Sequence, residues 1–416
     1  MGHPPMKRCL LLLLCVAVAT AYPLDGYKRT GIRRLLGYQL AQQGKVRGPK
    51  VPPGGMRGEA EIHLRLLGNR TLDINARTPR DPSLQAGLER ILGGRSASYG
   101  VAVLDITDTR KLRYAAVREN EKQLPGSVGK LLIVGGFLDA LKAVYPQSDD
   151  RERILRETVR AADGFVVRDG KTVPFFTEDA KAVVNRQIAI GDRFNLWEWL
   201  DHMLSQSSNA AGSFNWKEAM LLRHFGAKYP PSSADEKAFL TSTPKTELAA
   251  LALETLEAPL READLNPANL RLGTMFTSGG QRVVPGTQSY ATPLELLRWL
   301  VRMEQGRLVD EWSSLEIKKL IYFSRPRYRY ASAPSLASDA VFFKSGSFFQ
   351  CIPEEGFTCK AYAGNKTNIM NSIAVVETGT RTYLVALMSN VLRVNAAYEH
   401  QRIAELVEKL LATESK

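Results

Sequence analysis

The sequence of 416 residues predicts a mixed α/β fold of the α+β kind. An antiparallel sheet formed by both chain ends is flanked by helices and carries an inserted all-helical lobe. Two patterns predict this fold. Alternating apolar residues typical of strands occur early in the chain and again near its C-terminal end, whereas the long middle region has helical spacing. The composition, 44% hydrophobic and 24% charged, is that of an ordinary globular protein.

The chain begins with a predicted export signal. Two basic residues precede an apolar run at positions 9–18, and small residues up to Ala21 form a cleavage site. The run is too short to span a membrane, so residues 1–21 are predicted to be a signal peptide. A lipoprotein anchored at Cys15 is the alternative, although a leucine rather than a small residue precedes that cysteine. We therefore expect export to the periplasm or the extracellular space.

A basic extension is predicted over residues 22–81. The formal net charge of +13 is concentrated near the N-terminus, where residues 22–95 hold 14 Lys and Arg against 6 Asp and Glu. An exported protein meets little nucleic acid, so no nucleic-acid partner is expected. We interpret the extension as a solvated or envelope-facing surface, and contact with anionic wall polymer or lipid stays open.

Local patterns predict the first elements. Residues 26–45 are typical of an amphipathic helix, and alternation around a Gly-Asn turn predicts a hairpin over residues 61–75. From Pro82 the leucine spacing changes to that of a helix. Residues 99–107 and 111–119 then predict two strands joined by a short turn.

The main domain is predicted over residues 82–416. Its α/β part comprises residues 82–143 and 330–416, and residues 144–329 form the helical lobe. The clearest lobe helices are expected at 195–211 and 292–308, and the C-terminal part is expected to hold strands at 340–348, 371–379 and 382–391 followed by a helix at 396–411.

Two cysteines remain after the predicted signal peptide. Cys351 and Cys359 lie in one short segment, CIPEEGFTC. An even pair in an exported protein indicates a disulfide that closes a small loop. No histidine lies near the pair in the sequence, so no metal site is predicted.

The segment GSVGK, residues 126–130, could cradle a phosphate or hold a nucleophile. A phosphate loop needs four residues before its Gly-Lys pair and Ser or Thr after it, and here two residues intervene and Leu131 follows. The alternative is a serine nucleophile. Lys130 follows Ser127 by three residues and therefore shares its helix face. A desolvated lysine can accept the proton of a serine hydroxyl.

Two further motifs follow in order. Ser207-Ser208-Asn209 comes after a predicted lobe helix, and Lys344-Ser345-Gly346 lies on a predicted strand. Ser-x-x-Lys, Ser-x-Asn and Lys-Ser-Gly in this order form the signature of active-site serine β-lactamases and penicillin-binding enzymes. Over residues 82–414 the chain resembles the class A β-lactamase-like, penicillin-binding serine hydrolase family. The resemblance implies a β-lactamase/transpeptidase-like fold, and it implies no cofactor.

The resemblance implies roles in the reaction. Ser127 would attack a carbonyl carbon and become acylated, with Lys130 as its proton partner. Ser207 would relay a proton to the leaving nitrogen. The backbone N–H groups of Ser127 and Ser347 would form the oxyanion hole.

It also implies roles in substrate binding. Asn209 would hold the substrate amide. Lys344 would supply positive potential for a substrate carboxylate, and Ser345 would hydrogen-bond it. Gly346 would let the substrate lie against the strand.

Removal of the acyl group is the least determined step. In class A enzymes a glutamate in a Glu-x-x-Leu-Asn motif positions the hydrolytic water. Residues 262–266, EADLN, match this motif between Asn209 and Lys344, so Glu262 is the candidate base. The alternative is that Leu265 and Asn266 simply end a helix before Pro267.

Three functions follow. The first is a β-lactamase that hydrolyses β-lactam amide bonds through a Ser127 acyl-enzyme. The second is a penicillin-binding D-Ala-D-Ala peptidase or esterase of the cell wall with slow β-lactam turnover. The third is a non-catalytic binding module. The disulfide segment after the Lys-Ser-Gly strand is expected near the mouth of the site, and the sequence does not determine the oligomeric state.

Overall fold

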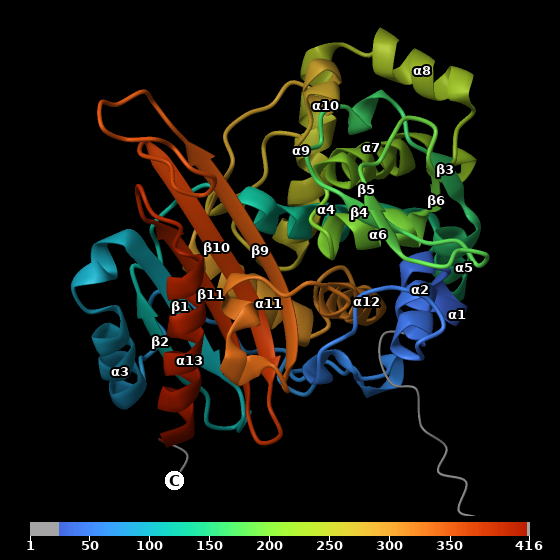
Figure 1. Ribbon diagram of the computed structural model, residues 1–416. Coiled ribbons are helices and arrows are strands. Elements are labelled where there is room, and N and C mark those ends of the chain that lie inside the picture. Colours follow the sequence, from blue (N-terminus) through green and yellow to red (C-terminus); the bar gives the residue numbers. More distant parts are fainter. Residues whose placement is uncertain (1–24, 414–416) are drawn as a thin grey trace, which may run out of the picture.

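The computed structural model describes residues 25–413, and its centre is a five-stranded antiparallel sheet (Figure 1). The strand order is β2-β1-β11-β10-β9. The strands are β1 (Tyr99–Asp105), β2 (Arg113–Val117), β9 (Ala340–Gln350), β10 (Thr367–Glu377) and β11 (Thr382–Asn390). The first two precede the lobe and the other three follow it, which confirms the predicted sheet from both chain ends.

Helices cover both faces of this sheet (Figure 1). Val101 and Val103 of β1 pack in one apolar cluster with α3 (Pro82–Leu92) and α13 (Ala397–Thr413). Ala102 and Leu104 point the other way and join the larger cluster formed with the lobe. Successive residues of a strand face opposite sides, so a strand covered on both faces is apolar throughout.

The lobe is mainly helical. Its helices are α4 (Lys130–Val144), α5 (Ser148–Glu157), α6 (Leu196–Leu204), α7 (Asn209–Phe225), α8 (Ser233–Ser242), α9 (Lys245–Glu262), α10 (Ser278–Val283), α11 (Pro293–Glu304) and α12 (Glu311–Tyr322). It is not entirely helical, because three two-stranded ribbons join them. These ribbons pair β3 (Val159–Ala161) with β6 (Arg193–Asn195), β4 (Val173–Phe175) with β5 (Val184–Arg186), and β7 (Leu270–Arg271) with β8 (Tyr290–Ala291). Strands of two or three residues are too short to show a period of two in the sequence.

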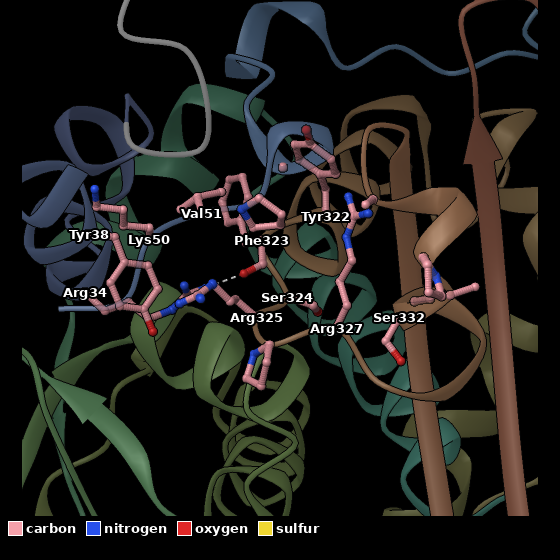
Figure 2. A pocket seen from close by; sticks show the side chains of 17 residues that line it. Arg34, Tyr38, Lys50, Val51, Tyr322, Phe323, Ser324, Arg325, Arg327 and Ser332 are labelled. Atoms are coloured by element: carbon pink, nitrogen blue, oxygen red, sulfur yellow. Dashed lines mark hydrogen bonds between the residues drawn. The ribbon is translucent and has the colours of Figure 1, made fainter. Parts of the chain in front are cut away.

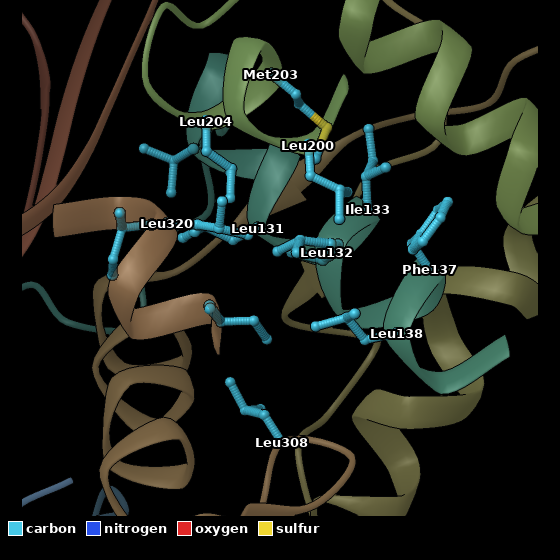
Figure 3. Packing of buried hydrophobic residues seen from close by; sticks show 14 of the residues in the cluster. Leu131, Leu132, Ile133, Phe137, Leu138, Leu200, Met203, Leu204, Leu308 and Leu320 are labelled. Carbon is cyan, nitrogen blue, oxygen red and sulfur yellow. The ribbon is translucent and has the colours of Figure 1, made fainter. Parts of the chain in front are cut away.

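Helix α4, which the sequence analysis assigned to the α/β part, packs against the lobe helices α7 and α9 and forms the centre of the lobe (Figure 3). Its side chains Leu131, Ile133 and Leu138 are buried against α6 and other lobe elements. A helix enclosed on every side is apolar all round, as the run after Lys130 is. The buried helix provides a rigid base for the residues at its N-terminal end.

The N-terminal segment wraps around the lobe and joins the same core. It contains α1 (Tyr27–Thr30) and α2 (Arg33–Gln42), which replace the single predicted helix. The predicted hairpin at residues 61–75 is wrong, because this segment contains no strand. Its apolar side chains pack against helices instead, and the amide of Leu66 donates to the carbonyl of Glu304 at the end of α11.

Several arginines of this segment form ion pairs, most of them with the body of the protein. Arg29 contacts Glu59, Glu152 and Glu316, and the buried Arg34 forms a two-point contact with buried Asp201. The prediction of a solvated surface is therefore wrong for these arginines.

A buried lysine connects the N-terminal segment to the sheet. Lys318 of α12 donates to the carbonyl of His63 at 2.7 Å, to Glu304 of α11 at 2.9 Å and to Glu377 of β10 at 2.8 Å. The side chains of Lys318 and Glu304 are fully buried, and that of Glu377 is 1% exposed. One ammonium thus joins four separate parts of the chain.

Within residues 25–413 no helix is long and apolar enough to cross a membrane. The predicted signal peptide lies outside the described residues. The predicted disulfide between Cys351 and Cys359 is confirmed, and it closes a loop directly after β9.

Replacing Lys318 with methionine is expected to lower the free energy of unfolding by about 3–5 kcal/mol, because buried Glu304 then loses its cation, whereas Glu377 keeps its contacts with Arg57 and Arg65. Urea denaturation measures this change. The exposed Lys245, at the start of α9, provides the control. We expect Lys245→Met to change stability by no more than about 0.5 kcal/mol. Equal effects of the two substitutions would contradict a structural role for the Lys318 contacts.

Candidate active site

Ser127 lies at the junction between the sheet and the lobe. It belongs to a 3-10 turn, η4 (Gly126–Gly129), that leads directly into α4. Gly126 has φ of 54°, and a Cβ there would lie 2.8 Å from the backbone nitrogen of Ser347 on β9. Only glycine fits this approach of the turn to the strand. In a 3-10 turn residues three apart lie one above the other, so Lys130 follows Ser127 on the same side.

Lys130 is fully buried next to this serine. Its Nζ donates to Ser127 Oγ at 3.1 Å, to the carbonyl of Ser207 at 2.7 Å and to Asn209 Oδ1 at 2.8 Å. The ring of Phe276 covers the same nitrogen at 4.3 Å. Within the described part of the chain, no carboxylate forms an ion pair with Lys130.

The surroundings of Lys130 disfavour its charged form. Burial lowers the pKa of its amine well below the ordinary 10.5, and the nearby cations Lys171 and Lys344 lower it further. Asp169 acts in the opposite direction. Ser207 O and Asn209 Oδ1 can only accept hydrogen bonds. They would therefore retain the two N–H groups of a neutral amine, and its lone pair would be available to the Ser127 hydroxyl.

Ser207 and Asn209 come from the tight turn between α6 and α7. Ser207 has φ of 57°, and Asn209 is the first residue of α7. Asp169 fixes this turn, because its Oδ2 accepts from Ser208 Oγ and from the amide of Ala210, both at 2.8 Å. Asp169 lies 39 residues before Ser208 and belongs to none of the motifs, so the sequence analysis missed it.

Strand β9 supplies the third motif. Lys344 is buried and donates to Ser207 Oγ at 2.8 Å. Burial lowers its pKa well below the ordinary value, with further effects of Lys171 and Arg329. A Cβ on Gly346 would lie 2.7 Å from the amide nitrogen of Ser127. The glycine therefore lets β9 approach the serine turn.

These residues border one cleft. A cavity of about 650 Å³ is lined by Ser127, Ser207, Ser345 and two cations, Lys171 and Arg329. It adjoins a second hollow of about 600 Å³, which Asn209, Phe276 and Ser347 line. No carboxylate is among the described residues that line either part. The structure thus brings eight predicted site residues together, namely Ser127, Lys130, Ser207, Asn209, Lys344, Ser345, Gly346 and Ser347.

Lys171 and Arg329 are cleft residues that the sequence analysis missed. Lys171 Nζ donates to the carbonyl of Ser207 at 2.9 Å, and burial lowers its pKa to about 8. Arg329 has φ of 53° and lies 5.8 Å from the ring of Tyr362. Neither residue stands in a recognisable motif.

Glu262 is not brought to the cleft. It is an exposed residue at the end of α9, and its charge acts on Asp139 of α4. Asp139 lies nine residues beyond Lys130, which is roughly 13 Å along a helix. The EADLN segment ends α9: Leu265 is buried, and the amide of Asn266 donates to Glu295. We therefore correct the assignment of Glu262 as deacylating base.

The disulfide loop begins beside the cleft. Phe349, at the end of β9, and Tyr362, just after the loop, line the hollow that holds Asn209. Their rings lie 5.7 Å apart. The residues that flank the loop therefore contribute aromatic rings to the mouth of the site, and the loop lies next to it, as the sequence analysis expected.

We expect Lys130 to become neutral at a pH well below 10.5, because burial opposes its charge. Lys171→Met removes a neighbouring positive charge, so the pKa of Lys130 should rise and its titration should move to higher pH. NMR of ¹³Cε-labelled lysine measures both effects, with the Lys130 signal assigned by its loss in Lys130→Met. The exposed Lys181 provides a control, because Lys181→Met should leave the titration unchanged. A shift to lower pH in Lys171→Met would contradict this account.

No protein-family model matches the chain, and no curated protein matches its sequence. Solved structures are similar in fold. A β-lactamase from Sphaerobacter thermophilus DSM 20745 has a TM-score of 0.51 at 12% identity, over 79% of this chain and 95% of its own. The extended-spectrum β-lactamase TLA-1 has 0.51 at 15%, over 80% and 99%. PBP-A has 0.50 at 12%, over 81% and 99%. The chain thus has a β-lactamase/transpeptidase-like fold.

Proposed function

We propose that this protein is an exported serine acyl-transfer enzyme of the penicillin-binding type, whose acyl-enzyme on Ser127 is long-lived. The observation that carries the proposal is the buried amine of Lys130, 3.1 Å from Ser127 Oγ and held with a lowered pKa. The donor would be a carboxylate-bearing amide, either a β-lactam or an acyl-D-Ala-D-Ala peptide of the cell wall.

Acylation would proceed in balanced steps. The Ser127 oxygen forms a bond to the carbonyl carbon while its proton passes to neutral Lys130. When the C–N bond breaks, Ser207 gives its hydroxyl proton to the leaving nitrogen and regains a proton from Lys130, whose Nζ is 3.5 Å from Ser207 Oγ. Lys344 donates to the same hydroxyl and keeps it oriented.

The charge that develops on the carbonyl oxygen would meet two backbone N–H groups. The close approaches at Gly126 and Gly346 lie next to the amide nitrogens of Ser347 and Ser127, which supports this role for the two amides. Loss of one oxyanion donor in acyl-transfer enzymes costs about 3 kcal/mol of transition-state stabilisation. This arrangement supports a catalytic site over a binding module.

The cleft favours an acyl donor that carries a negative charge. Lys171 and Arg329 line the cleft, and Lys344 contacts the lining residue Ser207. None of the described lining residues is acidic. Ser345 would hydrogen-bond the donor carboxylate, and Asn209 would hold the amide of the acyl side chain. A carboxylate in this field gains attraction from several cations at once.

Slow release of the acyl group follows from what surrounds Lys130. The ring of Phe276 lies 4.3 Å from the Lys130 amine, and no carboxylate that could activate water is among the described residues that line the cleft. The fold neighbours allow either function. They include β-lactamases and also a PBP-A variant, at 11% identity and a TM-score of 0.50, in an acyl-enzyme complex with penicillin G.

Incubation with benzylpenicillin is expected to add one penicillin mass to the protein, on the peptide that contains Ser127, and the adduct should persist. Intact-mass and peptide spectrometry measure both. Ser127→Ala should prevent the adduct, and Lys130→Met should slow its formation by about 100-fold or more, since the general base is lost.

Glu262→Gln is expected to leave the adduct lifetime unchanged, because this residue lies outside the cleft. Rapid turnover of nitrocefin by the wild type that is lost in Glu262→Gln would instead establish a β-lactamase. If the wild type gives neither an adduct nor turnover, the binding-module hypothesis replaces the proposed function.

A further inference from the structure

A cavity separate from both parts of the cleft lies between the N-terminal segment and the loop that follows α12 (Figure 2). Its volume is about 430 Å³, within the range of about 300–1,000 Å³ that is usual for small-molecule sites. The site motifs contribute no residue to it, and the proposed acyl transfer does not use it.

The walls of this cavity are mainly apolar. They are formed by aromatic, proline and small aliphatic side chains from both segments, namely Tyr38, Val51, Pro52, Tyr322, Phe323, Pro326, Ala331, Ala333, Pro334 and Ala337. The tyrosine hydroxyl of Tyr322 is already bonded, since it donates to the carbonyl of Gly54. A ligand that fills this space therefore needs an apolar body.

The polar groups of the cavity are cationic or hydrogen-bond donors. Ser324 Oγ is buried and has no hydrogen-bond partner among the described residues. Arg325 is half-buried, lies 6.0 Å from the ring of Tyr38, and forms no ion pair within residues 25–413. Burial lowers the pKa of Arg325, so its charge is poorly compensated. Lys50 adds a further positive charge at the exposed rim, and none of the described lining residues is acidic.

The other arginines of the cavity act as fixed walls. Arg34 contacts Asp201 and donates to the carbonyl of Phe323, the dashed contact in Figure 2. Arg327 donates to the carbonyls of Leu336 and Asp339. The adjacent Ser324 and Arg325 are thus the groups that a ligand would satisfy. A buried unpaired hydroxyl and a desolvated guanidinium each cost free energy that an anionic partner recovers.

We propose that this cavity binds a small amphiphilic monocarboxylate. Its apolar body packs against Tyr38, Val51 and Phe323, while its carboxylate accepts hydrogen bonds from Arg325 and from the Ser324 hydroxyl. Cations are repelled by the rim, and a compact polyanion leaves the apolar walls unfilled.

The catalytic cleft lies directly next to this cavity and is also cationic. Pro326, Arg327 and Ser332 line both spaces. An experiment must therefore separate binding in the cavity from binding in the cleft. Acylation of Ser127 or its replacement alters the cleft only, whereas changes at Ser324, Arg325 or Ala337 alter the cavity only.

Isothermal titration calorimetry with decanoate, and with decanamide as its neutral counterpart, tests the proposal. We expect saturable binding of one decanoate and about tenfold weaker binding of decanamide, because a hydrogen bond to a charged group contributes about that factor. Arg325→Gln should weaken decanoate binding about tenfold and leave decanamide binding unchanged. Ala337→Trp, at an exposed position on the cavity wall, should prevent binding of both.

Two controls fix the site. Arg90→Gln, on the exposed side of α3, should leave decanoate binding unchanged, and so should Ser127→Ala. The proposal is overturned if decanoate does not bind, if Arg325→Gln and Ala337→Trp bind it as the wild type does, or if Ser127→Ala abolishes binding. This outcome is independent of the proposed acyl transfer, which benzylpenicillin tests at Ser127.

Discussion

The candidate site depends on one constraint, the burial of the Lys130 amine against two oxygens that can only accept hydrogen bonds. The carbonyl of Ser207 and the amide oxygen of Asn209 hold the amine, and Phe276 covers it. This geometry requires the apolar helix α4 to begin one 3-10 turn after Ser127. It also requires the turn between α6 and α7 to contact the Lys130 amine. The sheet, the lobe and Asp169 can each be understood as supports for that arrangement.

Much of the fold and most of the site could be predicted from the sequence, because both rest on local patterns. The strands of the central sheet alternate or are wholly apolar, and α3, α11 and α13 have clear helical spacing. The three motifs each occupy three or four consecutive residues, so their order along the chain was sufficient to identify Ser127, Ser207 and Lys344 as partners. Folding then brings the residues of the three motifs into contact around the buried Lys130 and Lys344.

The rest depends on contacts between segments that are distant in the sequence. Asp169 fixes the Ser207 turn from 38 residues away, and Phe276 reaches Lys130 from a loop without a motif. Glu262 shows the opposite error, since the three residues that match the motif, Glu262, Leu265 and Asn266, stand at the end of a helix. The apolar residues of segment 61–75 alternate as in a hairpin. The segment packs against helices, however, and it pairs with no strand edge within residues 25–413.

The cluster of cations around Ser207 has a consequence for the order of events. Lys171 and Lys344 make the Lys130 amine a weak acceptor of protons. In the proposed reaction, a carboxylate that enters the cleft would offset those charges and raise the affinity of the amine for a proton when Ser127 releases one. The substrate would thereby strengthen the base that activates Ser127 for attack. Uncharged amides of the same shape would bind without this effect, so selection against them would act on the chemical step as well as on binding.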